Sequence, residues 1–190
     1  MDKILFRVRI SSVVLFLGLL ALVPFSHAKD ARISLAIDTR ALTLTVMQGA
    51  SPVEVFENIA IGSNGATREK RLGDEKTPLG TFRVTEIRES ERFVMFIAID
   101  YPNREHIQRA LEAKRITPAE YAELAMALRQ NGTAPQTSSL GGHLGIHGLG
   151  FGDRYIHDNF NWTNGCIALT NAQLERLLQW VQPGAVVKIH

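Results

Sequence analysis

Two residues of this chain, Cys166 and His147, have side chains that together could carry out nucleophilic chemistry. Cys166 is the only cysteine, so it has no partner for an internal disulfide. A thiol becomes a strong nucleophile when it loses its proton, and histidine is the residue that most often accepts that proton. The pair therefore suggests a covalent mechanism with a cysteine nucleophile and a histidine base.

Glycines accompany both residues, since His147 stands in the segment GIHG and Cys166 follows the turn TNG. Glycine lets the backbone come close to another group or adopt unusual dihedral angles. A glycine before a nucleophile also lets backbone N–H groups turn toward a developing oxyanion. These local features alone leave open a buried, inert thiol and a surface histidine, because free cysteine is usually buried.

Alternating apolar residues predict strands that would position this pair. They cover residues 33–37, 42–46, 53–61, 80–90 and 93–102, mostly antiparallel, and then 143–148, 166–169 and 185–190. In the third of these, Val53, Val55, Ile59 and Ile61 are expected to face the core in one alternating series. The predicted class is α+β, mostly β.

Capping residues predict three helices. Asn103 starts the first, and Thr117-Pro118-Ala119-Glu120 is a capping box that starts a second helix, which ends at Asn131-Gly132. These two helices form an insert within residues 103–140, and a lid role for it is a hypothesis. Thr170 starts the third helix, just before the last strand.

The N-terminus predicts export from the cytoplasm. Residues 1–28 combine a basic start, a short apolar stretch and small residues at Ser26 and Ala28, which is typical of a secretory signal peptide. The alternative is an uncleaved anchor. The chain holds 21 basic and 19 acidic residues, of which three and one lie in residues 1–28, so residues 29–190 hold 18 of each sign. We therefore expect one domain at 29–190, in the periplasm or cell envelope, with no nucleic-acid partner.

The motifs around the pair resemble those of the YkuD-type L,D-transpeptidases (ErfK/YbiS-like). His147-Gly148 followed by Thr163-Asn164-Gly165-Cys166-Ile167 is similar to the active-site signature of that family. The segment GDEKTPLGTF at 73–82 resembles a second family motif, and DYPN at 100–103 is similar to one branch of it. The resemblance extends from about residue 33 to residue 189. It implies the family's β-sandwich-type catalytic domain.

The resemblance also implies roles for individual residues. Cys166 matches the nucleophile that attacks the third residue of a peptidoglycan stem tetrapeptide and releases D-alanine. His147 matches the base, and the carbonyl of Gly148 matches the group that orients its imidazole. The turn Thr163-Asn164-Gly165 would supply oxyanion or substrate contacts. No cofactor or metal is implied, the partners are peptidoglycan stem peptides, and we expect a monomer with no membrane span after signal cleavage.

Two positions depart from the family pattern. Asn164 replaces a common histidine, which leaves His147 as the base without a competing histidine beside the cysteine. Ala168 replaces an arginine that is thought to hold a substrate carboxylate in relatives. Arg154 and His157 are candidates to replace that arginine by position alone, and the interpretation we favour is that both are solvated residues of the loop between His147 and Cys166.

Other interpretations remain open at this stage. The same Cys–His pair could serve an L,D-carboxypeptidase or a peptidoglycan amide hydrolase, and the domain could also bind the wall without catalysis. A metal site is a further alternative, with His143 and His147 joined by His157 and Cys166. In a straight strand, however, side chains four residues apart are about 13 Å apart, which is too far for one ion. We expect His106 and His190 to face solvent.

Overall fold

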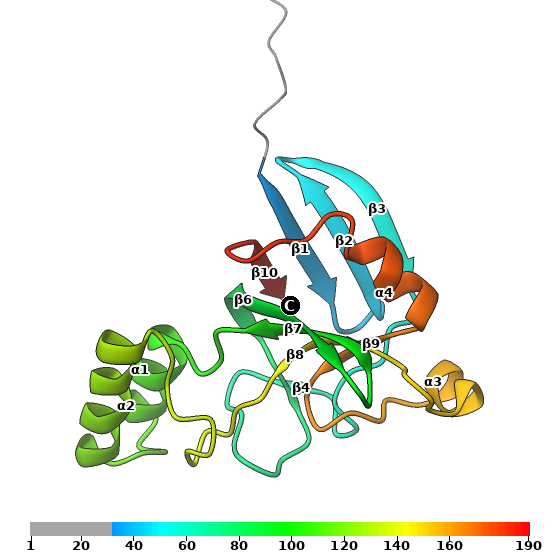
Figure 1. The fold of residues 1–190 in the computed structure, drawn as a ribbon. Coiled ribbons are helices and arrows are strands. Elements are labelled where there is room, and N and C mark those ends of the chain that lie inside the picture. Colours follow the sequence, from blue (N-terminus) through cyan, green and yellow to red (C-terminus); the bar gives the residue numbers. More distant parts are fainter. Residues whose placement is uncertain (1–31) are drawn as a thin grey trace, which may run out of the picture. The chain divides into compact units, whose positions relative to one another are not determined.

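The computed structural model describes residues 32–190, so the predicted signal peptide at residues 1–28 lies outside the described residues. The larger sheet has eight strands in the order β3-β2-β1-β10-β6-β7-β8-β9 (Figure 1). Its strands are β1 (Ile33–Asp38), β2 (Thr43–Gln48), β3 (Ser51–Glu57), β6 (Gly80–Ser90), β7 (Val94–Ile99), β8 (Gly145–Gly148), β9 (Ile167–Leu169) and β10 (Val186–Ile189). A second, two-stranded sheet pairs β4 (Ala66–Thr67) with β5 (Thr77–Pro78).

The long strand β6 joins two halves of the large sheet. Its first residues, Gly80–Arg83, pair with β10, and its remainder pairs with β7 across a register shift after Val84. Apolar side chains from both halves share one core, including Leu35 of β1, Ile97 of β7 and Leu169 of β9. An antiparallel bridge between Ala60 and Ala168 links the two halves a second time. The predicted α+β, mostly β class is confirmed.

Four helices lie outside the large sheet (Figure 1): α1 (Arg104–Glu112), α2 (Pro118–Asn131), α3 (Arg154–Asn159) and α4 (Asn171–Leu177). The predicted caps start α1, α2 and α4, because the side chains of Asn103, Thr117 and Thr170 each accept a backbone N–H of the first turn. At α2 only the threonine half of the predicted capping box forms, since the Glu120 carboxylate accepts the Ser139 hydroxyl instead. The segment that holds Arg154 and His157 was expected to be a loop, and it forms the helix α3 instead.

The two insert helices have a core of their own. Ile107 and Ala110 of α1 pack with Leu124 of α2 and with Leu140, apart from the core of the sheet. Figure 1 shows the pair at one end of the sheet, beyond β6 and β7. The predicted insert is therefore a small helical unit that lies beyond the ends of β6 and β7. Within residues 32–190, no helix is long and apolar enough to cross a membrane.

Two expectations about burial were wrong. Val53 and Val55 are 37% and 49% exposed, while Phe56 of the same strand is buried. Ile59 and Ile61 are buried as predicted, because Asn58, with φ of 56°, interrupts the extended backbone and changes which residues face inward. The predicted alternation therefore does not run through the whole segment.

His106 is buried and does not face solvent as expected. Its ring stacks on Phe82 with centroids 4.8 Å apart, and its nitrogens lie 2.8 Å from Asn103 Oδ1 and 3.2 Å from the Leu79 carbonyl oxygen. Burial lowers its pKa to about 4. His190 is exposed, as expected.

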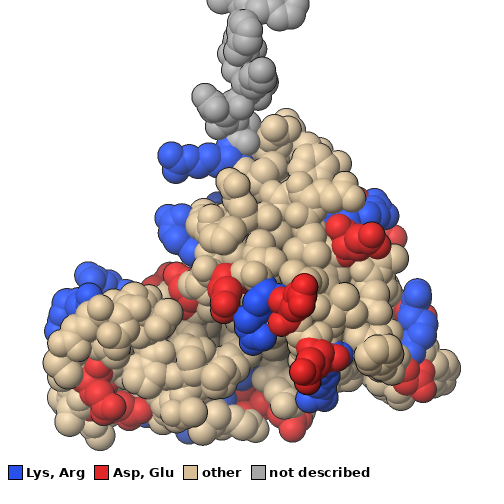
Figure 2. All heavy atoms as spheres, viewed as in Figure 1, with Lys and Arg blue, Asp and Glu red and all other residues tan. Residues whose placement is uncertain are grey.

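The surface carries both signs of charge. On the face shown in Figure 2, acidic and basic side chains alternate, and no broad patch of one sign appears. This agrees with the equal numbers of basic and acidic residues in positions 29–190.

Candidate active site

The turn before Cys166 is tied together by one hydroxyl. Thr163 Oγ1 accepts the Gly165 N–H at 3.1 Å and donates to the Cys166 carbonyl oxygen at 2.7 Å. Thr163 is itself buried. These bonds hold the TNG turn in a shape that delivers Cys166 to the start of β9.

Gly165 is required at its position for two reasons. Its φ is 123°, a conformation that residues with a Cβ rarely adopt. A Cβ there would lie 2.5 Å from the Lys76 carbonyl oxygen and 3.1 Å from Lys70 Nζ. The backbone in front of the thiol is therefore packed directly against the segment that carries Lys70 and Lys76.

The sheet places His147 and Cys166 on the same face. β8 and β9 are parallel, and His147 is the register partner of Ala168. Cys166 precedes Ala168 by two residues, and side chains two apart in extended chain point to the same side. Sheet pairing thus brings together two residues that are 19 positions apart in the sequence.

Aromatic rings hold the imidazole in place. Phe93 stacks on His147 with ring centroids 3.9 Å apart, and Trp162 meets it edge-on at 5.7 Å. The Trp162 indole N–H in turn donates to His157 Nδ1 at 3.3 Å. His147 is 2% exposed, so its ring has little freedom to reorient.

The tautomer of His147 follows from one contact. His147 Nδ1 lies 2.8 Å from the carbonyl oxygen of Gly148, which can only accept a hydrogen bond. Nδ1 must therefore carry the hydrogen, and Nε2 keeps its lone pair. Burial lowers the pKa of His147 to about 4, and the positive charge of Arg92 adds to the shift, so the ring is neutral at pH 7.

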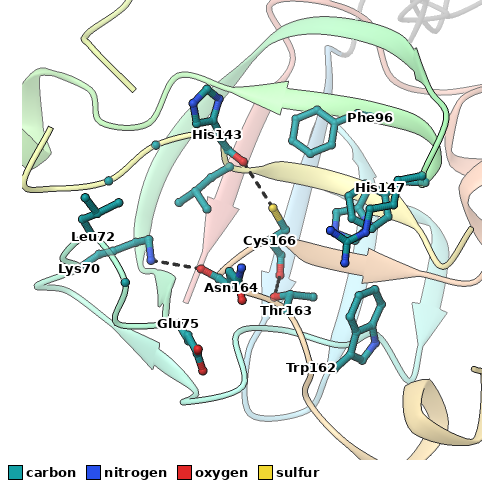
Figure 3. A pocket seen from close by; sticks show the side chains of 16 residues that line it. Lys70, Leu72, Glu75, Phe96, His143, His147, Trp162, Thr163, Asn164 and Cys166 are labelled. Atoms are coloured by element: carbon teal, nitrogen blue, oxygen red, sulfur yellow. Dashed lines mark hydrogen bonds between the residues drawn. The ribbon is translucent and has the colours of Figure 1, made fainter. Parts of the chain in front are cut away.

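The thiol is also neutral at rest. Burial raises the pKa of Cys166 to about 11, although the Gly145 N–H and the charge of Lys70 oppose that shift. Its Sγ lies 3.7 Å from the His143 carbonyl oxygen (Figure 3). The resting site therefore holds a neutral thiol and a neutral imidazole.

Both side chains open into one cavity of about 420 Å³. Figure 3 shows His147 and Trp162 on one side of Cys166, and Lys70, Leu72 and Glu75 on the other. Asn164, Thr163 and His143 also line it. This volume lies within the range of small-molecule binding sites in proteins.

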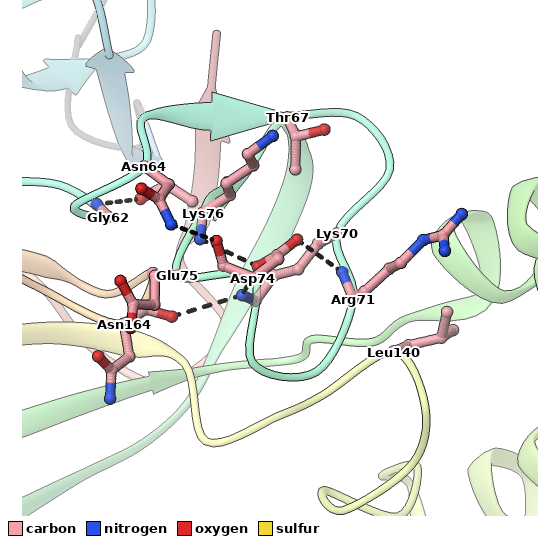
Figure 4. Close-up of polar contacts among 12 residues, drawn as sticks. Gly62, Asn64, Thr67, Lys70, Arg71, Asp74, Glu75, Lys76, Leu140 and Asn164 are labelled. Carbon is pink, nitrogen blue, oxygen red and sulfur yellow. Dashed lines mark hydrogen bonds and ion pairs between the residues drawn. The ribbon is translucent and has the colours of Figure 1, made fainter.

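An ion pair between buried Lys70 and partly buried Asp74 supports the wall opposite His147 (Figure 4). Lys70 is 4% exposed, and its Nζ lies 2.7 Å from Asp74 Oδ1 and 3.4 Å from the Asn164 carbonyl oxygen. Asp74 also accepts the backbone N–H groups of Arg71 and Lys76. These bonds together lower the pKa of Asp74 although burial alone would raise it. Lys70 thereby links the 70–76 loop to the turn Thr163-Asn164-Gly165 in front of Cys166.

The helical insert holds the cavity walls from behind. None of the residues 103–140 lines the cavity. The Arg115 guanidinium donates to the Lys70 carbonyl oxygen at 3.1 Å, and the Leu72 N–H donates to Ser139. Gln136 accepts the His143 N–H at 2.7 Å. The insert therefore anchors the two loops that lie on either side of Cys166.

The predicted site residues separate into two groups. Cys166, His147, Thr163 and Asn164 line the cavity, and Gly148 and Gly165 act through their backbones. Arg154 and His157 lie on α3 and do not line it. Arg154 pairs with Asp158 at 2.7 Å, and His157 is buried behind Trp162. Neither side chain therefore lies where it could contact a ligand in this cavity.

Lys70, Arg92 and Phe93 are among the cavity-lining residues that the sequence did not reveal. No spacing in the sequence distinguishes Lys70 from the other charged residues of its loop. Arg92 and Phe93 lie in the turn between β6 and β7 and reach the site only because β7 pairs with β8. Among residues 32–190, no group of three or more His, Cys, Asp or Glu side chains is arranged to hold a metal ion, so His143, His147, His157 and Cys166 do not form the alternative metal site.

Several solved structures share this fold. The helical cell shape determining protein Pgp2 from Campylobacter jejuni superposes with a TM-score of 0.57 at 22% identity, over 84% of this chain and 47% of that chain. Bd1075 from Bdellovibrio bacteriovorus gives 0.51 at 15% identity, over 84% and 48%. The chain thus spans about half the length of these structures. No curated protein matches it closely enough to count as a relative.

The sequence itself matches a family model over nearly all the described residues. The match covers residues 32–189 and is to the YkuD family, described as the L,D-transpeptidase catalytic domain. It includes the motifs at 73–82, at His147-Gly148 and at Thr163–Ile167 that carry the resemblance in the sequence. The chain therefore belongs to the YkuD family of L,D-transpeptidase catalytic domains.

Proposed function

We propose that this protein is a peptidoglycan L,D-transpeptidase, a cysteine-dependent acyltransferase with Cys166 as nucleophile and His147 as base. The observation that carries the proposal is the Nδ1 contact of His147 with Gly148, at 2.8 Å. It leaves Nε2 as the only basic nitrogen of a ring on the same sheet face as the thiol. The family of the chain makes a peptidoglycan stem peptide the expected substrate.

The first half of the proposed reaction acylates the enzyme. His147 Nε2 takes the thiol proton while Sγ attacks the carbonyl carbon of the third stem residue. The Cys166 N–H is the proposed oxyanion donor, because the Gly165 N–H already donates to Thr163. The C–N bond then breaks and His147 returns the proton to the leaving amine. D-Alanine departs, and the third stem residue remains bound to Cys166 as a thioester.

The second half transfers the acyl group. An acceptor amine attacks the thioester carbon, His147 takes a proton from that amine, and the C–S bond breaks to restore the thiol. With a second stem as acceptor the product is a cross-link. Water as acceptor would make the same apparatus an L,D-carboxypeptidase or an amide hydrolase, and the acceptor that is used decides between them.

We further propose that this chemistry takes place in the cell envelope, with residues 1–28 as the export signal and residues 29–190 as the catalytic domain, acting as a monomer. Pgp2 is described as a determinant of helical cell shape. By analogy, a role of this chain in cell shape is part of the proposal. N-terminal sequencing of the exported protein should give Lys29 as its first residue.

The decisive experiment is mass spectrometry of the protein incubated with a disaccharide-tetrapeptide. The expected result is a Cys166 adduct that has the mass of the substrate less D-alanine, followed by a cross-linked dimer or a tripeptide. Cys166→Ala and His147→Ala should form no adduct. His143→Ala is the matched control, because His143 lines the same cavity but its ring points away from Cys166 (Figure 3). Unchanged wall binding without an adduct would instead favour a non-catalytic wall-binding domain.

A further inference from the structure

The cavity is lined by a cation, Arg92, that forms no ion pair with the described residues. Arg92 lies in the turn between β6 and β7 and lines the cavity next to Phe93 and His147. Its Cζ lies 4.9 Å from the centre of the Phe93 ring, and that ring stacks on His147 at 3.9 Å. Arg92 is exposed. It forms no ion pair with any of the described residues.

The other candidate cations are already occupied or distant. Lys70 is buried against Asp74 on the opposite side of Cys166 (Figure 3). Arg154 is paired with Asp158 outside the cavity. Ala168, where relatives carry an arginine, is fully buried and bridged to Ala60. Among the described residues, Arg92 is therefore the guanidinium available to an anion in this cavity.

The chemistry of the leaving group fixes where its carboxylate must lie. In a stem tetrapeptide the amine that leaves belongs to D-alanine, and a single carbon separates that amine from the terminal carboxylate. His147 has to reach the amine to return the proton. The group that binds the carboxylate must therefore lie beside His147, and Arg92 is in that position through their shared contact with Phe93.

We propose that Arg92 binds the terminal α-carboxylate of the residue that leaves, and so selects donor stems that end one residue after the scissile bond. This inference rests on the proposed function. Guanidinium groups bind carboxylates through two parallel N–H donors, and the contact of Arg92 with the Phe93 ring keeps its guanidinium at the cavity wall. Donors whose terminal carboxylate is amidated, or lies further away, would lose this contact.

The test compares acylation by a tetrapeptide with a free D-alanine carboxylate and by the same peptide with a terminal carboxamide. The wild-type protein should prefer the free acid by about ten- to a hundred-fold in kcat/KM, as expected for one charge-assisted hydrogen-bonded pair. Arg92→Gln should lose that factor on the free acid and change by less than about two-fold on the amide. Arg92→Lys should recover part of the preference.

Arg88→Gln is the matched control. Arg88 lies on the same hairpin, with its Cζ 5.0 Å from the centre of the Phe96 ring, but it does not line the catalytic cavity. This variant should keep the wild-type preference. The inference is overturned if Arg92→Gln retains the preference, or if it loses rate equally on both peptides. Absence of any Cys166 adduct in the wild-type protein would overturn the proposed function itself, which is a separate outcome.

Discussion

The Nδ1 atom of His147 and the carbonyl oxygen of Gly148 lie 2.8 Å apart, in adjacent residues of one strand. Because the acceptor is a backbone atom, no side-chain substitution elsewhere removes it. The contact ties the orientation of the base to the path of β8. The contact also fixes the protonation of the ring. The imidazole is neutral, carries its hydrogen on Nδ1 and can accept one proton on Nε2.

The pH dependence of acylation follows from these two groups. With the pKa of His147 at about 4 and that of Cys166 at about 11, the neutral pair is the dominant form between those values. We expect kcat/KM for adduct formation to rise with pH through about 4 and then to stay level through neutral pH. Reactions quenched at timed intervals between pH 3.5 and 9 would measure this kcat/KM, and circular dichroism at each pH would confirm that the protein is folded. An acid limb between pH 6 and 7 would contradict this protonation scheme.

The raised pKa of the thiol gives a second, independent readout. Iodoacetamide reacts with the thiolate, so alkylation of Cys166 should be slow at pH 7 and should rise about ten-fold for each pH unit toward pH 10. Mass spectrometry of the intact protein would measure the fraction of alkylated chains over time. A rate that is already maximal at pH 7 would show that a thiolate–imidazolium pair exists at rest.

Gly165→Ala should slow acylation about a hundred-fold without removing any chemical group. The new Cβ would meet the Lys76 carbonyl oxygen at 2.5 Å, so the nucleophile turn must shift. A displacement of about 1 Å at the nucleophile costs on the order of a hundred-fold in rate. Gly184→Ala is the matched control, since Gly184 also has a positive φ, 89°, but has no atom within 4 Å of the added Cβ. It should lose about 1–2 kcal/mol of stability and keep its acylation rate.

Lys70→Met should destabilise the fold by about 3 kcal/mol, because it leaves the Asp74 carboxylate without its buried partner. Urea unfolding followed by tryptophan fluorescence would measure the loss. The corresponding exposed pair is Arg154–Asp158, in which Arg154 is 66% exposed. Arg154→Met should cost no more than about 1 kcal/mol. Equal losses for the two variants would show that the Lys70 pair contributes no more than a surface pair.

Stability should fall as the pH drops from about 6.5 to about 4. The pKa values of buried His106 and His147 are lowered to about 4, whereas unfolded histidine titrates near 6.5. In that window the unfolded chain binds more protons, so acid favours unfolding, by at most about 1.4 kcal/mol per pH unit for each histidine. Urea titrations at several pH values would measure the slope. His106→Gln should reduce it, and an unchanged slope would show that His106 titrates normally in the fold.

Local chemistry made much of this molecule predictable. Asn103, Thr117 and Thr170 each start a helix, because capping depends only on a side chain and the N–H groups two or three residues later. Cys166 and His147 were identified for a similar reason, since their reactivity is a property of residue type and of the glycines beside them. The burial of His106, by contrast, depends on Phe82 and Leu79, which lie more than 20 residues earlier.

Short contiguous segments were enough to predict Cys166 and His147 as candidate nucleophile and base, together with the strand-rich class and the family motifs. The charges that face the thiol could not be predicted in this way. Lys70 and Arg92 reach the cavity through a loop packed on the nucleophile turn and through the pairing of β7 with β8. Arg154, which is nearer to Cys166 in the sequence, pairs outside the cavity. The reason is physical: sheet pairing and loop packing set distances in space that separation along the chain does not encode.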